Sequence, residues 1–376
     1  MRVMHLITNM MGTGGAEVML LRLASAIGGE RPIIVSLMDV SERHRQVIAD
    51  HDLDVRPLKV RSTAGMMKSV LTVRQLIRNE RPDALMCWLY HAMVVGQAAA
   101  WRVADEVPVY WNVRQSLDDI SSFSASTRTA LQLTRLLSSR PTGIVFNSSR
   151  ALHLHRQFGY RNPNLVTIPN GFDFVEEIPV NARRPLVFGI AGRLHPQKDY
   201  ATFFAAASHA HRCHPEIRFV AAGAGLTLDS AIVRQMIADA GLPLSAIELR
   251  GNVSDMAGFY HDIDALVLSS RTEGFPNVVA EAMSFAKPVI STDVGDAAVI
   301  VGDSGFIVPP GDVTALADAM DRMQGLRPSE YAVLAAAAKR RVDSVYPLAR
   351  VAELYDLFFR GAPAPPAASE GQSRSV

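Results

Sequence analysis

Residues 3–27 read VMHLITNMMGTGGAEVMLLRLASAI: an apolar run, a glycine-rich turn and an amphipathic stretch. The run Val3–Thr8 is typical of a buried strand, and Glu17–Ile27 has apolar residues at helical spacing. Gly12, Gly14 and Gly15 lie between them, where backbone N–H groups at the start of a helix attract anions. The stretch therefore predicts one strand–turn–helix unit of an α/β fold, with a turn suited to a phosphate.

The same alternation continues along the first half of the chain. Further strand-like runs occur at Pro32–Leu37, Ala84–Leu89, Val107–Trp111 and Gly143–Phe146. After a stretch rich in Pro, Asn and Gly, the alternation restarts in LVFGIAGRL, IRFVAAGAG, AIELRG, DALVLSS, PVISTDVG and GFIVPP. Strands that alternate with helices imply parallel sheets covered on both faces, so the sequence predicts two doubly wound α/β domains in tandem.

Length also favours two domains, because 376 residues exceed the size at which a single core usually keeps growing. We expect a first domain over residues 1–168, a linker over 169–184, a second domain over 185–345, a final helix over 346–360 and a tail over 361–376. The tail lacks the apolar content needed to fold, so we expect it to be disordered.

Charge and cysteine content exclude several classes of protein. The net charge of +1 gives no support to a nucleic-acid partner. Residues 1–168 contain 20 Lys/Arg and 13 Asp/Glu, and the remainder contains 18 and 24, so the two halves carry about +7 and −6. Cys87 and Cys213 are too few for a disulfide framework, and no signal-like apolar region follows Met1. We therefore expect a cytoplasmic protein.

The stretch GIAGRLHPQKD, residues 189–199, places cations after a strand of the second domain. Gly192 and Arg193 follow the strand directly, and Lys198 precedes the next helix. Two cations at the carboxyl end of a strand can neutralise a diphosphate leaving group. The alternative is a pair of solvated surface cations.

The stretch RTEGFPNVVAEAMSFAKPVI, residues 271–290, places two acids near the start of a helix. Glu273 lies in the loop after a strand, and Pro276 begins the helix that contains Glu281. Both carboxylates can therefore face one ligand above the helix N-terminus, where they would accept hydrogen bonds from paired sugar hydroxyls. The alternative is two ordinary solvated acids.

Taken in this order, and with IPNGFD at 168–173 and GFIVPPGD at 305–312, these motifs resemble the family-four retaining glycosyltransferases of the GT-B fold. The resemblance extends over about residues 1–360. It implies two facing Rossmann-like domains and a C-terminal helix that crosses back to the first domain. It also implies transfer of a sugar from a UDP- or GDP-linked donor to a hydroxyl of a glycan or lipid-linked acceptor, without a cofactor, in polysaccharide or cell-surface glycan biosynthesis.

The resemblance also assigns roles to individual residues. Arg193 and Lys198 would grip the donor diphosphate, and Glu273 would hold hydroxyls of the transferred sugar; these three form the catalytic set. Glu281 would bind the ribose. The donor-binding residues would be Gly14, Gly15, Gly192, Val253, Gly274, Phe275, Pro276, Asn277 and Glu281.

The chain departs from the family pattern on the acceptor side of the first domain. Many members have a histidine just after the fourth strand, where this chain reads YWNVRQSLDD with Arg114. A guanidinium stays protonated and cannot act as a base, but it could bind an acceptor phosphate or stabilise the leaving group. His91 and Asp118 are the other acceptor-side candidates, with a helix-capping histidine and a solvated loop acid as the alternatives.

Two stretches contain residue types that could bind a metal, but we interpret neither as a metal site. The Asp-x-Asp pattern in HDID, residues 261–264, precedes a strand and is interpreted as a helix end and turn. Four potential ligands also crowd one helical stretch: His209, His211, Cys213 and His214. They are interpreted as an exposed helix end before Pro215. No metal site is therefore predicted, and the chemistry is expected to be metal-independent.

Residues 56–82 contain seven Lys/Arg among apolar residues. A basic amphipathic helix can lie on an anionic membrane, which would place the protein at the inner face of the cell membrane. The alternative is a helix whose basic face is solvated.

Two other functions stay open. The turn at Gly12–Gly15 could belong to an NAD(P)-binding oxidoreductase, although Glu17 stands where that fingerprint has a third glycine or alanine. A non-catalytic two-domain sugar-binding protein would share the two-domain architecture, but it would usually be exported and would not need Arg193, Lys198 and both glutamates.

Overall fold

The computed structural model describes residues 1–12, 14–26, 31–101, 103, 107–174 and 185–362. Residues 175–184 of the predicted linker and 363–376 of the predicted tail lie outside these ranges. The chain divides into two compact units. Unit 1 comprises Met1–Phe172 and the segment that begins at Tyr346, and unit 2 comprises Asp173–Val345.

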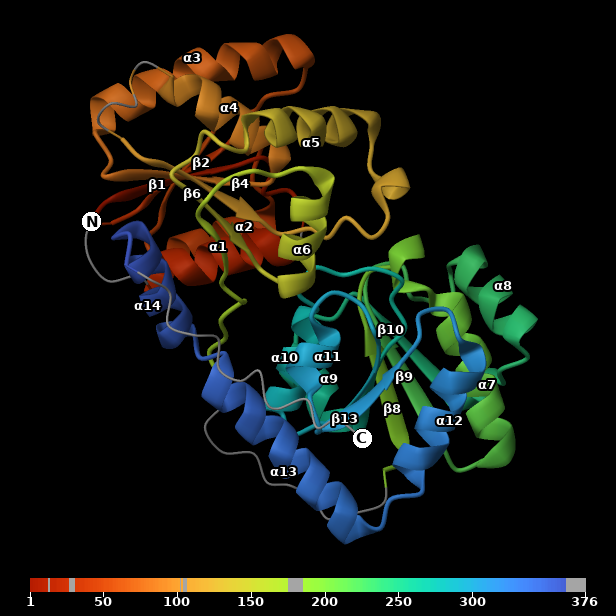
Figure 1. Ribbon diagram of the computed structural model, residues 1–376. Helices are drawn as coiled ribbons and strands as arrows, with labels where there is room; N and C mark the ends of the chain where they lie inside the picture. Colours follow the sequence, from red (N-terminus) through yellow and green to blue (C-terminus); the bar gives the residue numbers. More distant parts are fainter. Residues whose placement is uncertain (13, 27–30, 102, 104–106, 175–184, 363–376) are drawn as a thin grey trace. The chain divides into compact units, whose positions relative to one another are not determined.

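Unit 1 contains a seven-stranded parallel sheet in the order β3-β2-β1-β4-β5-β6-β7 (Figure 1). Its strands are β1 (Val3–Ile7), β2 (Ile33–Ser36), β3 (Asp54–Pro57), β4 (Ala84–Trp88), β5 (Val109–Val113), β6 (Gly143–Phe146) and β7 (Leu165–Thr167). The strand order reverses between β1 and β4, which is the doubly wound arrangement that the alternating pattern predicts.

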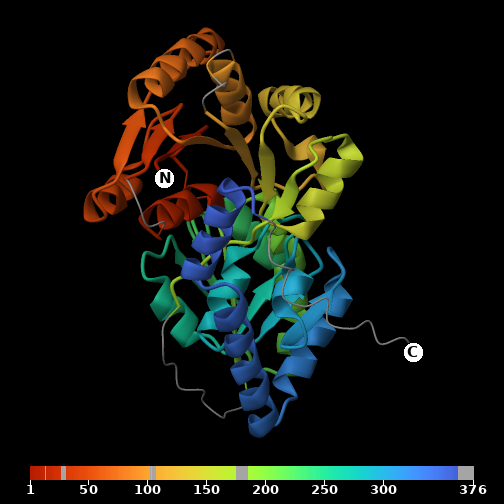
Figure 2. The same cartoon turned by 60° about the vertical axis from the view of Figure 1, so that its left-hand side comes forward.

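Helices cover both faces of this sheet (Figure 2). One face is covered by α3 (Thr63–Glu80), α4 (Tyr90–Ala100), α5 (Ala125–Leu137) and α6 (Ser149–Phe158). The other is covered by α1 (Gly15–Ala26), α2 (Glu42–Asp50) and α14 (Leu348–Phe359). A short 3-10 helix, η1 (Ile120–Ser122), precedes α5.

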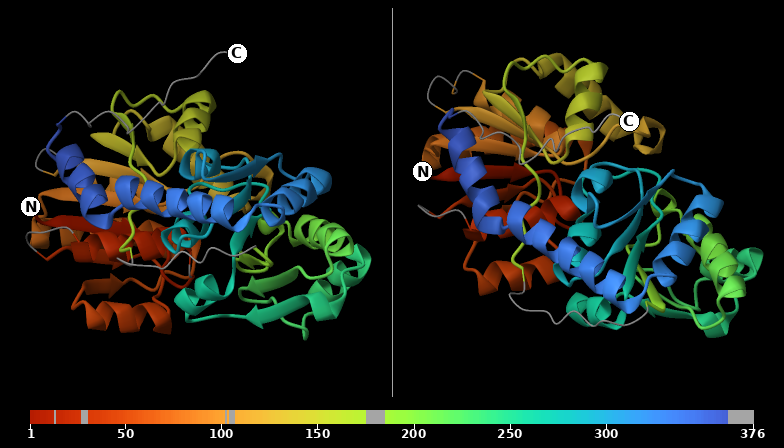
Figure 3. Two further views of the ribbon diagram at one scale, coloured as in Figure 1. Left: turned by 90° about the horizontal axis from the view of Figure 1, so that it is seen from below. Right: turned by 60° about the horizontal axis from the view of Figure 1, so that its bottom comes forward.

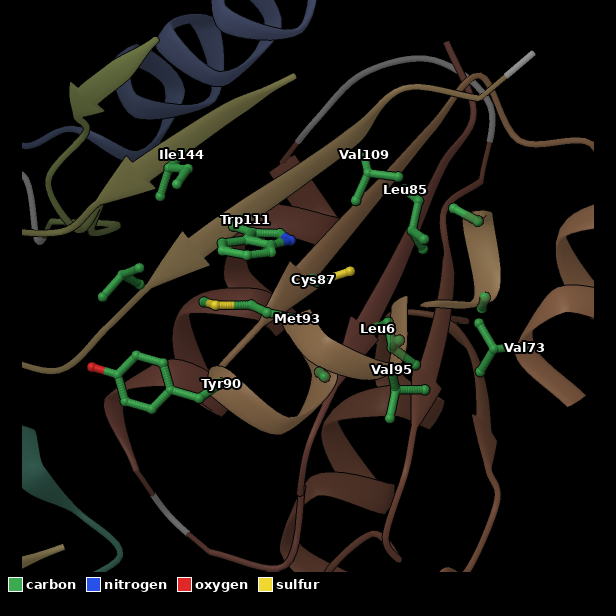
Figure 4. Packing of buried hydrophobic residues seen from close by; sticks show 14 of the residues in the cluster. Leu6, Val73, Leu85, Cys87, Tyr90, Met93, Val95, Val109, Trp111 and Ile144 are labelled. Carbon is green, nitrogen blue, oxygen red and sulfur yellow. The ribbon is translucent and has the colours of Figure 1, made fainter. Parts of the chain in front are cut away.

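The core beneath α4 shows why the apolar runs form strands. Leu6, Cys87 and Trp111 come from β1, β4 and β5 and project to the same side of the sheet, against Met93 and Val95 of α4 (Figure 4). All five side chains are buried. Since alternate residues of each strand face the opposite helical layer, both faces of these strands are apolar, as expected for a parallel sheet.

The C-terminal helix α14 packs on unit 1, as predicted, although it follows all of unit 2 in the sequence (Figures 1 and 3). It lies beside α1 and places Tyr355, Phe358 and Phe359 in the core. The Asn112 amide donates a hydrogen bond to the Tyr355 hydroxyl at 2.8 Å, and the Tyr110 hydroxyl donates to the Phe359 carbonyl at 3.1 Å.

Unit 2 contains a six-stranded parallel sheet in the order β10-β9-β8-β11-β12-β13. Its strands are β8 (Val187–Ala191), β9 (Arg218–Ala222), β10 (Ile247–Gly251), β11 (Ala265–Leu268), β12 (Val289–Thr292) and β13 (Gly305–Val308). One face is covered by α7 (Tyr200–Cys213), α8 (Ala231–Ala240) and α12 (Val313–Gln324). The other helices are η2 (Pro196–Lys198), η3 (Leu244–Ala246), α9 (Met256–Asp262), α10 (Asn277–Ser284), α11 (Ala297–Val301) and α13 (Pro328–Val345).

The HDID stretch has a structural role at the start of β8. Helix α9 ends at Asp262, as the interpretation of a helix end and turn requires. Asp264 is buried, and its Oδ2 accepts hydrogen bonds from the backbone N–H groups of Leu186 and Val187, both at 2.9 Å. Its carboxylate therefore fixes the start of β8, at the amino ends of the strands.

Candidate functional site

Most predicted donor residues of unit 2 follow two neighbouring strands, β8 and β11, at their carboxyl ends, and Val253 follows β10. In doubly wound sheets this is the edge where ligands bind, because the loops there are free of core packing. The loops after these strands also contact one another, which fixes their side chains.

Two glycines let the loop after β8 approach the loop after β9. Gly223 has φ +154°, and a Cβ at that position would lie 1.8 Å from the carbonyl oxygen of Gly192. The Tyr200 hydroxyl donates a hydrogen bond to that same oxygen at 2.6 Å. The backbone that leads into Arg193 is therefore held from two sides, and Arg193 itself is exposed.

Asp199 fixes the other end of this loop. It is buried in a left-handed conformation with φ 48°, and it begins α7 by accepting a hydrogen bond from the Thr202 hydroxyl at 2.8 Å. Arg271, from the loop after β11, lies 2.9 Å from the same carboxylate. A left-handed backbone at a non-glycine residue is strained and persists only where its surroundings hold it. Here the contacts of Asp199 with Thr202 and Arg271 hold it, and with it the backbone next to Lys198.

Lys198 and Glu273 form the central ion pair of this edge. The Lys198 Nζ lies 2.6 Å from Glu273 Oε1, and the Ser270 hydroxyl donates to that oxygen at 2.7 Å. The two charged side chains are only 19% and 11% exposed, so solvent screens the pair less than an ordinary surface ion pair. The structure thus brings together two of the three residues predicted to be catalytic.

Glu281 lies in the second turn of α10, and its carboxylate is positioned by a tyrosine. The Tyr260 hydroxyl donates a hydrogen bond to Glu281 Oε2 at 3.0 Å. Helix α10 begins at Asn277, with Pro276 as its N-terminal cap residue. Its first N–H groups thus lie beside the predicted donor residues Gly274 and Phe275.

The loop after β12 supports this turn. Gly295 has φ +53°, and a Cβ there would lie 2.2 Å from the Gly274 carbonyl oxygen, so only glycine allows the loops to approach this closely. Val253, another predicted donor-binding residue, lies partly exposed in the loop after β10, the outermost strand of this sheet.

His195 lies in the β8 loop between the two predicted diphosphate ligands. Burial, followed by the charges of Arg193 and Lys198, lowers the pKa of His195 from its ordinary value. Both cations thus lie within electrostatic range of this histidine, and Lys198 is also paired with Glu273. Two cations in one loop are suited to an anionic group such as a diphosphate.

Sequence reasoning missed Asp199, Tyr260, Ser270 and Arg271. Asp199 had a local signal, because Asp followed three residues later by Thr is typical of a helix start. Tyr260 had none: it acts on Glu281, 21 positions away, through a contact that only the folded sheet creates.

In unit 1, the predicted donor turn at Gly14 and Gly15 packs against its own helix. Glu17 is buried, and a Cβ at Gly14 would lie 2.6 Å from Glu17 Oε2. Glu17 thus occupies the place where the dinucleotide fingerprint has a third glycine or alanine. The oxidoreductase alternative gains no support from this turn.

The acceptor-side candidates lie at the carboxyl ends of β4 and β5 in unit 1. His91 is in the first turn of α4. Burial lowers its pKa, and a hydrogen bond with the Ser126 backbone partly opposes that shift. Asp118 Oδ1 lies 2.6 Å from the Arg150 guanidinium, and its other oxygen accepts a hydrogen bond from the Ser116 hydroxyl. Asp118 is thus held by neighbouring side chains and is not a solvated loop acid.

Arg114 is buried, with 8% of the residue exposed. Its guanidinium carbon lies 4.9 Å from the centre of the Trp88 ring. Within the described ranges no hydrogen bond of good geometry reaches its three side-chain nitrogens. Burial lowers the pKa of Arg114, and the nearby Tyr355 hydroxyl partly opposes that shift. The guanidinium is therefore stacked on Trp88 and almost completely buried.

Both units match models of known families. Residues 185–324 match the model of "Glycosyl transferases group 1", and residues 12–171 match that of "Glycosyl transferase 4-like domain". The two matches together cover most of the chain.

Curated relatives match shorter segments. The capsular polysaccharide biosynthesis glycosyltransferase CapM of Staphylococcus aureus is 39% identical over 74 residues, which is 19% of this chain and 20% of CapM. Glycogen synthase of Mycobacterium tuberculosis is 31% identical over 173 residues, 43% of this chain and 40% of that protein. The lipopolysaccharide core biosynthesis mannosyltransferase LpsB of Rhizobium meliloti is 30% identical over 148 residues, 37% and 42% of the two chains. The matched segments thus span less than half of each relative.

Solved structures match the whole fold at low sequence identity. HepE of Anabaena in complex with UDP has a TM-score of 0.82 at 21% identity, over 96% of this chain and 100% of HepE. Sucrose-phosphate synthase of Thermosynechococcus elongatus has a TM-score of 0.78 at 18% identity, over 96% and 99% of the two chains. The likeness places both parallel-sheet units in the GT-B fold that the sequence motifs predict. With the family models matching each unit in turn, the chain belongs to the group 1 glycosyltransferases.

Proposed function

We propose that this chain is a retaining, metal-independent hexosyltransferase that moves a sugar from a nucleoside diphosphate donor to a hydroxyl of a glycan or lipid-linked acceptor. The observation that supports it best is the enclosed Lys198–Glu273 pair, with Arg193 exposed beside it. Such a pair offers a cation to a phosphate and a carboxylate to a sugar hydroxyl, and the two groups are close enough to bind the same donor molecule.

The proposed chemistry follows from these charges. The bond between the anomeric carbon and the donor phosphate breaks, and the acceptor oxygen bonds to that carbon on the same face. The departing phosphate takes the acceptor proton. Arg193 and Lys198 stabilise the negative charge that develops on the diphosphate, an effect commonly worth about 3–4 kcal/mol for one removed donor.

The remaining donor contacts are assigned by position. Glu273 accepts hydrogen bonds from the transferred sugar, and Glu281 accepts them from the ribose. The backbone N–H groups of Gly274, Phe275 and Asn277 face the sugar and phosphate, because a helix N-terminus favours anions. Gly14 and Gly15 of unit 1, Gly192 and Val253 complete the proposed donor set.

The names of relatives support a nucleotide-sugar donor and a role in polysaccharide assembly. HepE was solved with UDP and with UDP-glucose, and CapM is a capsular polysaccharide biosynthesis enzyme. We therefore propose a UDP- or GDP-linked donor, no resident cofactor, and a setting in polysaccharide or cell-surface glycan biosynthesis. On the acceptor side we propose contacts from His91, Asp118 and Arg114.

Helix α3 supports contact with an anionic membrane surface. The exposed cations of this region are Lys59, Arg61, Lys68, Arg78 and Arg81. Met67 and Leu71 are 74% and 65% exposed among them, which is the composition of a helix that binds at a lipid interface. No described helix is long and apolar enough to cross a bilayer. We propose a cytoplasmic protein that contacts the inner face of the membrane.

Replacement of Lys198 tests the proposed function. In Lys198→Ala, transfer of a labelled sugar from the preferred donor should fall by about 10²–10³-fold in kcat, because one stabilising donor is lost from the transition state. The matched control is Lys339→Ala, which removes a lysine from another ion pair of unit 2, Lys339–Asp343 at 2.9 Å.

The control variant should transfer at the wild-type rate, and both variants should keep the wild-type circular dichroism spectrum. Turnover of folded Lys198→Ala within about threefold of wild type would contradict the assignment.

A further inference from the structure

A cluster of metal-binding side chains joins α7 to α12 on unit 2. His209 and Cys213 are four positions apart on α7 and so share one face of that helix. Asp321, on α12, faces them, and the potential ligand atoms of these three residues all lie within 4.8 Å of one another. The two helices lie side by side on the same face of the sheet (Figure 1).

A potential fourth ligand lies near Asp321, outside the group of three. His214, the residue at the C-terminal cap of α7, has its Nε2 3.9 Å from Asp321 Oδ1. The same oxygen is buried and forms no hydrogen bond with any residue that the structure describes. A buried carboxylate oxygen without a partner is costly, and a cation would satisfy it.

The ligand set identifies the metal. One thiolate, two imidazoles and one carboxylate match the ligands of tetrahedral Zn²⁺, whereas Mg²⁺ and Ca²⁺ prefer oxygen alone. In such a site neighbouring ligand atoms lie about 3.3–3.8 Å apart. His209 and Cys213 are exposed, so their side chains can rotate by the small amount needed.

We propose that His209, Cys213, His214 and Asp321 bind one Zn²⁺ ion, which fastens α7 to α12. Binding exchanges the thiol proton of Cys213 for the metal, so one proton leaves to solvent for each thiolate formed. This revises the interpretation of the stretch as a plain helix end. His211 is not counted as a ligand, because it lies two positions from both His209 and Cys213 on α7 and so does not share their face of the helix. Its Nδ1 lies 3.1 Å from the Ile217 carbonyl oxygen.

The site is separate from the donor residues. Helices α7 and α12 each run from the carboxyl edge of the sheet back to the amino edge, and all four ligands lie near their C-terminal ends. The ion would therefore support the fold of unit 2 and take no part in sugar transfer.

The test uses the full chain, stripped with a chelator and titrated with Zn²⁺ against a coloured competing chelator. We expect one equivalent of Zn²⁺ to bind and to raise the melting temperature. Co²⁺ in its place should give the strong visible bands of a tetrahedral site and a near-ultraviolet thiolate-to-metal band. Cys213→Ser should abolish the thiolate band, and Cys213→Ser and Asp321→Asn should each weaken Zn²⁺ binding by about 100-fold or more.

Two matched variants keep the test specific. His211→Gln removes the histidine beside the cluster, and Cys87→Ala removes the other thiol of the chain, which is buried in unit 1. Both should bind Zn²⁺ as wild type does. The proposal is overturned if the wild-type chain binds no Zn²⁺ in the competition assay, or if Cys213→Ser keeps the affinity and the thermal shift.

Discussion

At the scale of single residues, the donor edge of unit 2 depends on side chains that hold other side chains. Glu273 forms an ion pair with Lys198 and accepts a hydrogen bond from the Ser270 hydroxyl, and Glu281 accepts one from the Tyr260 hydroxyl. A carboxylate held in one rotamer loses less entropy when a sugar hydroxyl binds to it. Sequence motifs singled out Glu273 and Glu281 as candidates, but they did not single out Ser270 or Tyr260, which hydrogen-bond to them in the fold.

Tyr260 is the clearest of these positioning residues. Its ring packs on Phe285 with centroids 5.2 Å apart, so Tyr260→Phe removes the hydroxyl and keeps the packing. Loss of a hydrogen bond to a carboxylate should raise the donor KM about tenfold, with kcat changed by less than about threefold. Steady-state kinetics with donor as the varied substrate would measure the two constants separately.

Tyr331→Phe is the control, because its hydroxyl bonds to the Asp264 carbonyl at 2.8 Å, at the start of the strands. It should leave donor KM unchanged. An unchanged KM in Tyr260→Phe as well would mean that the Tyr260 hydroxyl does not position Glu281 for the donor.

At the scale of elements, the fold was predictable where the apolar pattern was long. The six runs of unit 2 all form strands, and the final helix predicted over 346–360 spans Leu348–Phe359 in the structure. Strands β3 and β7 of unit 1 were missed, because each is short and only half-buried. Their position at the two edges of the sheet comes from pairing with a neighbour, which a single strand's sequence does not show.

Helix α6 contains a histidine that makes the stability of unit 1 depend on pH. Burial lowers the pKa of His155 from 6.5 to about 4. Its Nε2 lies 2.9 Å from the Tyr90 hydroxyl, and its Nδ1 lies 2.7 Å from the Ala151 carbonyl oxygen. The unfolded chain binds a proton here more readily than the folded chain, so unit 1 loses stability as pH falls from 6.5 towards 4.

The loss is measurable by urea denaturation. Between pH 6.5 and 5, His155 alone should lower the free energy of unfolding by about 2 kcal/mol. All three tryptophans, Trp88, Trp101 and Trp111, lie in unit 1, so their fluorescence follows this unit. His5 adds to the effect, since burial lowers its pKa to about 3. A His155→Gln chain whose urea midpoint keeps the wild-type dependence on pH would contradict the account.

At the scale of the whole molecule, the chain returns to its first unit after completing the second. Residues 173–345 form unit 2, and α14 then fills one face of unit 1. This arrangement was expected from the family resemblance, because nothing in the local pattern of Leu348–Phe359 says which sheet it covers. The contacts that decide it are those of Tyr355 with Asn112 and of Phe359 with Tyr110.

Truncation before Tyr346 should therefore unfold unit 1 and not unit 2. Helix α14 buries five large side chains: Leu348, Val351, Tyr355, Phe358 and Phe359. Their burial contributes on the order of 10 kcal/mol, as much as the whole stability of an ordinary domain. Tryptophan emission of the truncated chain should shift to the red without denaturant.

A chain that ends at Ala362 is the control, because it keeps α14 entire and should fold as the full chain does. Native tryptophan emission from the chain truncated before Tyr346 would show that unit 1 does not need α14.

The central claim is that the carboxyl edge of unit 2 binds a nucleoside diphosphate sugar, and calorimetric titration of the full chain with UDP-, GDP- and ADP-sugars tests it most directly. The account predicts that one of these donors binds at a single site, and that Glu281→Gln weakens the binding by about tenfold or more. Absence of binding by every donor, or equal binding by wild type and Glu281→Gln, would contradict it.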